Sequence, residues 1–305
     1  MNGPAPSRTA LIAAFATIYL VWGSTYLGIR IAVETIPPFL LSGVRFAVAG
    51  TLIFTFLKLR GAAWPTARQW RDQAVVGVFL LLGGNAVVSW CELRVPSGIT
   101  CLILGAAPLV VVFMDWIRPG GRRPTAGLLV GVAVGIGGLA MLLGPGSIPA
   151  GYRPPLLETV ALFASSVCWW IGSLYSKHGR LGTPLIMASA MQMLCGSASI
   201  LVVALLLGEG RGLSLPGISP PSWIAFAYLV VVGSIVVFPV YTWLLEHSTP
   251  ALVSTYAYVN PVVAVFLGWI VLNEPLNARI LVAAAVIVGA VAIITIGRSK
   301  AAAGP

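Results

Sequence analysis

The stretch VSTYAYVNPVVAVFLGWIVLNEP, residues 253–275, is as apolar as a membrane span, yet two tyrosines, an asparagine and a proline lie near its start and middle. Hydrocarbon offers a polar side chain no partner, and a proline removes one backbone donor from a helix. We therefore expect this span to face other helices or water instead of lipid alone. The stretch predicts a membrane protein with a polar interior.

The composition agrees with that class. Only 9% of the 305 residues are charged and 58% are hydrophobic, against roughly 25% charged residues in a soluble domain. The net charge is +10, but the basic residues lie in short tracts between apolar runs. We interpret them as topology signals that contact anionic lipid headgroups, and we expect no nucleic-acid partner. The four cysteines form no CxxC pair, which favours packing over metal or redox chemistry, so no metal and no cofactor is expected.

Runs of about 18 to 23 apolar residues predict an all-α integral membrane protein with ten transmembrane helices. The polar stretch GGNAVVSW interrupts the third run, and Pro239 lies in the eighth. The first run is longer than a signal-peptide core, and we interpret it as an uncleaved span. The runs cover residues 10–29, 39–57, 73–91, 98–117, 125–143, 156–176, 184–207, 222–245, 251–272 and 279–297.

The basic residues orient these spans. If the N-terminus is inside, the inner segments hold 12 Lys and Arg residues and the outer loops hold 5, one in each. This bias predicts that both termini lie in the cytoplasm. Arginine outnumbers lysine 15 to 3, which is typical of GC-rich bacterial genomes. We therefore expect a multi-pass protein of the bacterial inner membrane.

The two halves of the chain resemble each other. At a shift of 153, PLVVVFMDWI at 108–117 aligns with PVVAVFLGWI at 261–270, and Trp90 aligns with Trp243. A shift of 149 aligns WGSTY at 22–26 with IGSLY at 171–175. With five spans in each half, the second copy enters the membrane from the opposite side, which is the inverted-repeat plan of many secondary transporters.

In such folds, interrupted helices at matching positions line a cavity at the membrane midplane. Pro108 and Pro261 hold matching positions, and this predicts that Tyr256, Tyr258 and Asn260 lie at the cavity wall; helix packing is the alternative.

The same residues resemble a known family. YLVWGSTYLGIRIAVETIPPFLLSGVRFAVAG at 19–50, VPSGITCLILGAAPLVVVF at 95–113 and STPALVSTYAYVNPVVAVFLGWIVLNEPL at 248–276 are similar to the EamA-type branch of the drug/metabolite transporter superfamily, and look most like its YedA-type exporters. The resemblance covers nearly the whole chain. It implies two inverted EamA repeats, at residues 1–150 and 151–305, and export of small organic molecules such as amino acids, related metabolites or drugs.

One position departs from the family pattern. The Gly-Glu or Asn-Glu that follows the ninth helix in the family is present as Asn273-Glu274, but the matching place in the first repeat, Gly120-Gly121, has no acid. Any role of Glu274 is therefore not duplicated in the first half.

Candidate cavity residues follow from polar or aromatic side chains inside the spans. Arg45 lies about seven residues into the second span, where a charge costs at least about 2.5 kcal/mol unless it is paired or hydrated. It is interpreted either as paired, with Glu34 or with carbonyls of a broken helix, or as a partner for an anionic substrate group. The full set is Trp22, Ser24, Arg45, Asn85, Trp90, Pro108, Trp169, Ser173, Tyr256, Tyr258, Asn260 and Pro261.

Other features leave alternatives open. Tyr26 and Tyr175 are interpreted as interfacial anchors or as cavity residues. Gly127, Gly131 and Gly135 form a ridge that serves packing within the fold or a homodimer. No acid lies in mid-span, and Asp115 has Arg118 as an ordinary partner three residues on, so proton coupling and uncoupled facilitation stay open.

These features predict a secondary transporter that exports small organic metabolites, most directly amino acids, by alternating access. The alternatives are a channel and a non-transporting membrane sensor. The sequence has no GxSxG or HExxH motif and only two histidines, which argues against a membrane-embedded enzyme. The identity of the solute and the oligomeric state do not follow from the sequence.

Overall fold

The structure is a computed structural model that describes residues 6–95, 100, 103–105, 107–118, 120–121, 123–142, 155–179, 182–211, 213–272 and 278–302. Every regular element among these residues is helical. In chain order the elements are α1 (Arg8–Ala32), α2 (Pro38–Leu59), α3 (Ala67–Gly77), η1 (Val78–Ala86), α4 (Val87–Cys91), α6 (Ala107–Ile117), α7 (Ala126–Leu142), α8 (Leu156–His178), α9 (Leu185–Leu206), η2 (Leu215–Gly217), α10 (Pro220–Val230), η3 (Val231–Val236), α11 (Val237–His247), α12 (Pro250–Val253), α13 (Tyr256–Leu272) and α14 (Ala278–Ala302).

Local sequence signals set several helix starts. The Ser7 hydroxyl accepts from the Ala10 N–H at the start of α1. Thr66 and Gln69 form a capping box at α3, in which each side chain satisfies the other residue's backbone N–H. α2 and α10 begin at prolines, whose missing N–H costs nothing in a first turn. These signals place the helix ends in the loops, as expected for membrane spans.

Six helical segments of the described chain are long and apolar enough to cross a membrane. They cover residues 8–32, 38–59, 67–91, 156–178, 185–206 and 220–247. α6, α7 and the apolar part of α14 are shorter apolar helices. The chain is therefore an all-helical, multi-pass membrane protein.

Two of the spans are wound partly as π-helix. The segment 67–91 consists of α3, η1 and α4, and the segment 220–247 consists of α10, η3 and α11, with η1 and η3 as the π-helical parts. These are the third and eighth runs, which the sequence interrupts with GGNAVVSW and Pro239. π-Helical segments often lie at functional sites, because the extra residue in the turn redirects side chains and loosens the backbone ladder.

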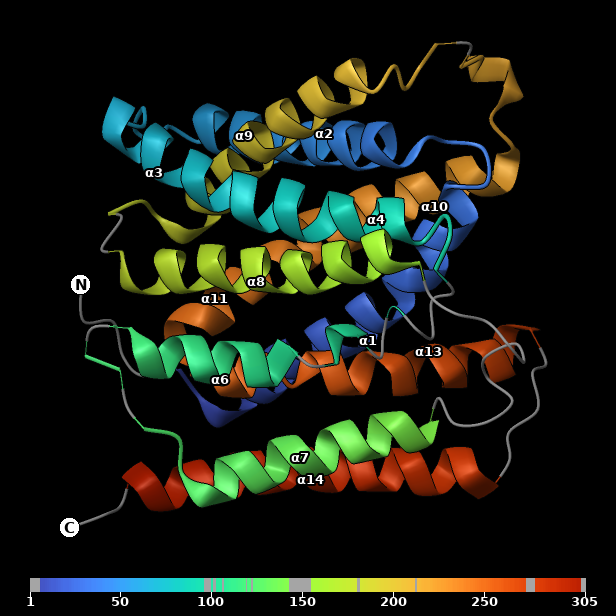
Figure 1. Cartoon of the computed structure of the whole chain (residues 1–305). Coiled ribbons are helices and arrows are strands. Elements are labelled where there is room, and N and C mark those ends of the chain that lie inside the picture. Colours follow the sequence, from blue (N-terminus) through green and yellow to red (C-terminus); the bar gives the residue numbers. More distant parts are fainter. Residues whose placement is uncertain are drawn as a thin grey trace.

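Figure 1 shows the helices running roughly along one direction, with α2 and α9 side by side at the top and α7 and α14 side by side at the bottom. Between these pairs, α8 packs against η1 and α4, and α1 packs against α13 and crosses α10 and α11. The central core contains Ile18, Trp170, Tyr241 and Val253. The bundle therefore surrounds a core that contains aromatic and polar groups as well as aliphatic ones.

The glycine ridge of α7 is occupied within the fold. A Cβ on Gly131 would lie 2.6 Å from Ile294 of α14, and one on Gly135 would lie 2.7 Å from the Tyr258 ring. The expected pair of Asp115 and Arg118 forms, with the Arg118 Nε 2.5 Å from the Asp115 Oδ1. Glu274 lies outside the described residues.

Candidate functional site

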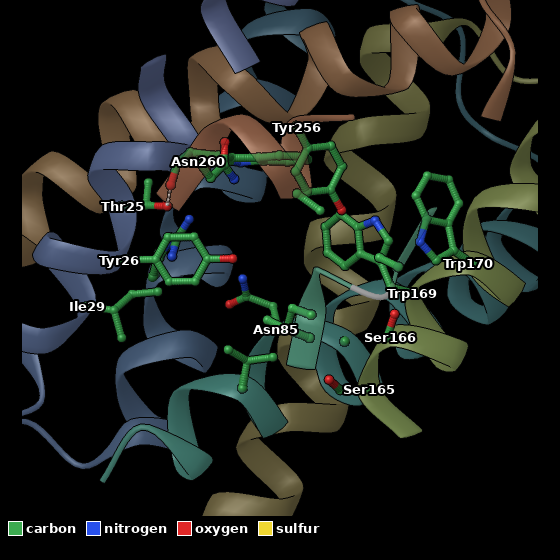
Figure 2. Close-up of a pocket in the computed structure, with 17 residues that line it drawn as sticks. Thr25, Tyr26, Ile29, Asn85, Ser165, Ser166, Trp169, Trp170, Tyr256 and Asn260 are labelled. Atoms are coloured by element: carbon green, nitrogen blue, oxygen red, sulfur yellow. Dashed lines mark hydrogen bonds between the residues drawn. The ribbon is translucent and has the colours of Figure 1, made fainter. Parts of the chain in front are cut away.

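One cavity opens between the spans, and Figure 2 shows its labelled side chains around a common space. Tyr26 and Ile29 of α1 lie on one side, Trp169 of α8 lies opposite, and Asn85 of η1 and Asn260 of α13 complete the ring. The residues lining it are Trp22, Thr25, Tyr26, Ile29, Arg45, Gly84, Asn85, Val88, Leu104, Ala107, Ser165, Ser166, Trp169, Trp170, Tyr256, Ala257 and Asn260.

Aromatic rings form one wall. The Trp22 ring centre lies 4.7 Å from that of Tyr256, 4.8 Å from that of Tyr241 and 5.6 Å from that of Trp169. Tyr241 is fully buried behind this wall, and its hydroxyl accepts from the Trp169 Nε1 at 2.7 Å and pairs with the Ser173 hydroxyl at 2.6 Å. The hydrogen bonds hold the rings at fixed angles, so the wall is a rigid surface for an apolar or aromatic group.

Gly23 sets the distance between α1 and α13. A Cβ at this position would lie 2.6 Å from the Cβ of Val263 and 3.2 Å from the Asn260 carbonyl oxygen. Because glycine has no side chain, α1 approaches α13 closely enough to bring Trp22 against Tyr256.

Arg45 is the only charged residue among the described residues that line the cavity. The side chain is buried, with 3% exposure. Its Nε donates to the Ser234 hydroxyl and its Nη2 to the Gly233 carbonyl, both at 2.7 Å. Both partners belong to η3 and both are neutral. Arg45 therefore pairs with a carbonyl of an irregular helix, which is one of the alternatives that the sequence left open. Arg45 forms no ion pair with any described acid, and the positive charge faces the cavity without an anion.

Several polar atoms at the cavity have no hydrogen-bond partner among the described residues. These are the Oδ1 atoms of Asn85 and Asn260, the Ser166 hydroxyl and the Trp170 Nε1. An unsatisfied buried polar group costs about 1–3 kcal/mol, so native proteins keep such groups where water or a ligand satisfies them. The cavity thus offers two acceptors and two potential donors to a solute.

The helix α13, which contains Pro261, contributes a further hydrogen-bond acceptor to the cavity. Pro261 lies inside α13, and it cannot donate to the carbonyl four residues earlier, that of Ala257. Ala257 lines the cavity, as does Leu104, which stands four residues before Pro108. Pro261 therefore acts on the cavity through the backbone that precedes it, whereas Pro108 is the second residue of α6, where a missing N–H costs nothing.

Six of the twelve residues selected from sequence line the cavity: Trp22, Arg45, Asn85, Trp169, Tyr256 and Asn260.

The structure places the other six elsewhere. The Ser24 hydroxyl pairs with Tyr228, Ser173 supports Tyr241, and Trp90 packs in the core between α2, α9 and α8. Pro108 and Pro261 are buried beside the lining residues Ala107 and Asn260.

Tyr258 points away from the cavity, and its hydroxyl donates to the Val132 carbonyl of α7 at 3.1 Å. The reason is helical geometry. Tyr256 and Asn260 are four residues apart and share one face of α13, whereas a residue two positions on lies on the opposite face.

Sequence reasoning left Tyr26 open and missed Thr25, Ser165 and Ser166, all of which helical spacing could have found. Thr25 and Tyr26 follow Trp22 by three and four residues, and Ser165 and Ser166 precede Trp169 by the same intervals. Small hydroxyl residues in apolar helices give a weak signal, because they satisfy themselves on their own helix, as Ser165 does by donating to the Leu162 carbonyl at 2.7 Å. Within the described part of the chain, no three His, Cys, Asp or Glu side chains group to hold a metal ion.

Known proteins share this chain's sequence pattern and fold. The profile of the EamA-like transporter family matches residues 9–144 and again residues 156–296. The chain is 36% identical over 290 residues to the uncharacterized inner membrane transporter YedA of Escherichia coli strain K12, covering 94% of this chain and 91% of that protein. It is 25% identical over 278 residues to Protein PecM of Dickeya dadantii strain 3937, covering 90% of this chain and 88% of that protein. A crystal structure of a protein with 22% identity matches it with a TM-score of 0.79, covering 96% of this chain and 99% of that one, which shows a shared fold.

Proposed function

The chain belongs to the EamA-like transporter family, and we propose that it exports small organic metabolites, most directly amino acids, across the bacterial inner membrane by alternating access. It is a YedA-like transporter and not an enzyme. The proposal concerns the substrate, the direction and the mechanism.

We propose that residues 1–150 and 151–305 are inverted repeats of five spans each, with α6, α7, α13 and α14 completing ten. The family profile matches the chain twice. The helix contacts are also paired: α2 meets α9, α7 meets α14, and the contact of α1 with α10 and α11 has its counterpart in the contact of α8 with η1 and α4. The π-helical parts begin at Val78 and Val231, 153 residues apart, which is the shift of the sequence repeat.

We propose that both termini face the cytoplasm. The excess of basic residues in the segments assigned to the inner side supports this orientation. The start of α1 and the end of α14 lie at the same end of the bundle in Figure 1. Reporter fusions at each terminus test the assignment, because alkaline phosphatase is active only outside the cytoplasm and green fluorescent protein only inside.

The substrate carboxylate would bind Arg45. A buried guanidinium without an anion is costly, and the Nε and Nη2 already donate to η3. A carboxylate from the cavity would neutralise it and form a charge-assisted hydrogen bond. This unpaired charge is the observation that carries the proposal.

The ammonium group and side chain of an amino acid have matching partners. The Oδ1 atoms of Asn85 and Asn260 accept no hydrogen bond from described residues, and the Ala257 carbonyl lacks its helical donor. These acceptors suit an ammonium, which has three donors and no acceptor. The rings of Trp22 and Tyr256 would cover an apolar or aromatic side chain.

The size of the cavity also favours a small solute. It encloses about 100 Å³, below the roughly 300–1,000 Å³ of sites for drug-sized ligands. An amino acid is therefore a better match than a bulky drug in this conformation.

Counterflow in proteoliposomes tests the function. Vesicles loaded with one unlabelled amino acid at a time would accumulate the labelled tracer transiently if the protein is a carrier. Saturable exchange that prefers apolar or aromatic amino acids is the expected result. Uptake without saturation or countertransport would favour the channel alternative. No exchange of any amino acid by folded, oriented protein would reject the proposed substrate class, and no flux of any solute would favour a sensor.

A further inference from the structure

Glu92 is a buried acid one residue beyond the membrane-spanning segment 67–91. Its exposure is 3%, and neither carboxyl oxygen has a hydrogen-bond partner among the described residues. Val88, one turn earlier in α4, lines the cavity. A carboxyl group with two unsatisfied oxygens thus lies about one helical turn from the substrate site, in a place where a carboxylate is much less stable than the neutral acid.

Arg30 is close to Glu92 but does not neutralise it in this arrangement. The Arg30 Nη1 donates to the Glu92 backbone carbonyl at 3.4 Å, whereas the carboxyl oxygens accept no hydrogen bond from described residues. Arg30 is exposed in the last turn of α1, next to the cavity residue Ile29. Arg30 nevertheless lies close enough for its positive charge to favour the ionised carboxylate of Glu92.

The other charged groups near Glu92 either already have a partner or lie deeper within the membrane-spanning helices. From α8, Glu158 is bound by Arg94 at 3.1 Å, and the adjacent Cys91 thiol donates to the Glu158 carbonyl. η1 has no titratable side chain, and on α2 the nearest is Arg45, one turn from Ser42, which donates to Ser89 of α4.

The protonation of Glu92 is therefore set mainly by its burial and by Arg30. Burial raises the pKa of Glu92 to about 8, and Arg30 opposes that rise.

We propose that Glu92 is the proton-binding site of this transporter and that closure of the Glu92 end of the bundle over the cavity requires a proton on its carboxyl group. In the orientation proposed above, this is the outer end. The inference rests on the proposed transport function and names its coupling ion. The sequence had left proton coupling open because no acid lies in mid-span.

The physical reason is the difference between the two conformations. When the outer end is open, water and Arg30 stabilise the carboxylate; when it closes, burial favours the neutral acid. Each closure from the open state therefore takes up one proton from outside. Because the closed form has the raised pKa, closure is favoured at low pH and is lost as pH rises through about 8. When the inner side opens, the proton passes to water in the cavity, and the carboxylate left behind favours reopening of the outer end with substrate bound, so one proton enters for each substrate that leaves.

The first experiment compares exchange with gradient-driven transport in proteoliposomes, with labelled phenylalanine as the probe. Exchange at equal pH needs no net proton movement, whereas one pH unit at one proton per substrate can hold about a tenfold concentration ratio. Glu92→Gln mimics the neutral acid permanently. It is expected to keep exchange, because a neutral side chain still permits closure, and to lose the accumulation that the pH gradient drives.

Glu209→Gln is the matched control, because Glu209 is a half-buried acid near the start of α2 whose carboxylate is satisfied by the Leu40 N–H at 2.9 Å. This variant should keep gradient-driven accumulation. If wild-type protein exchanges phenylalanine but a pH gradient drives no accumulation, the inference is overturned and the proposed function stands. Gradient-driven accumulation at the wild-type level in Glu92→Gln would have the same meaning. Absence of any exchange by wild type counts against the proposed function alone.

A second measurement needs no substrate and no variant. A hydrophobic carbodiimide reacts with protonated carboxyl groups in apolar surroundings, and mass spectrometry locates the adduct. Wild-type protein is expected to carry the adduct on Glu92, with a yield that falls as pH rises through about 8. An unmodified Glu92 at pH 6, or a yield that does not change between pH 6 and 10, would overturn the inference.

Discussion

Replacing Arg45 with glutamine should weaken binding of an amino acid much more than binding of the matching amine. Arg45 uses its Nε and Nη2 on Ser234 and Gly233 and keeps its remaining guanidinium donors for a solute. A hydrogen bond to a charged partner contributes about 1.5–3 kcal/mol, and each 1.4 kcal/mol is a factor of ten. Arg45→Gln should therefore raise the Kd for phenylalanine by about 10- to 150-fold.

Phenethylamine separates this effect from structural damage. It has the ring and ammonium group of phenylalanine but no carboxylate, so its Kd should change by less than about threefold in the variant. Both ligands would be titrated calorimetrically into purified protein, with the melting temperature of each variant measured alongside. Arg45→Lys keeps the charge but not the fork that holds η3, and should lie between wild type and Arg45→Gln. Equal losses for phenylalanine and phenethylamine would refute the reasoning, because Arg45 would then only hold η3 in place.

Asn260→Ala should abolish or strongly reduce counterflow with little change in melting temperature, because the Asn260 Oδ1 has no partner among described residues to lose; a large drop in stability would contradict this assignment. Trp22→Ala removes ring contacts worth about 0.5–1.5 kcal/mol each, and the variant should lose transport although it still inserts into the membrane. Normal transport in both Asn260→Ala and Trp22→Ala would contradict the assignment of the site. Gly77→Ala should destabilise the protein by about 1–3 kcal/mol in thermal unfolding, because a Cβ there would lie 2.4 Å from the Gln192 carbonyl oxygen. Gly137→Ala, where a Cβ meets nothing within 4 Å, is the matched control and should be neutral or slightly stabilising.

The six long spans of the described chain and 6 of the 17 residues that line the cavity could be predicted from the sequence. Hydropathy is a local property, so the apolar runs and the interruptions in the third and eighth spans are visible without the fold. Trp22, Asn85 and Asn260 could be selected because polar or large aromatic groups are unusual inside apolar helices. Tyr258 meets the same criterion, yet it contacts α7, because its position on the helix faces away from Asn260.

The sequence by itself determined the class of protein, the apolar runs, the resemblance of the two halves and the presence of polar residues in the spans, because each is encoded in neighbouring residues or in a fixed shift. Only the tertiary structure decided which polar groups meet. Arg45 lies 188 residues before the Gly233 carbonyl that it contacts. That carbonyl belongs to the π-helical segment η3, which no local sequence motif predicts. The sequence alone suggests that Glu92 is an ordinary loop acid. It is buried, and without a partner among the described residues, only because α1, α4 and α8 come together there. Burial is a property of the packed helices, and for both residues burial determines the chemistry.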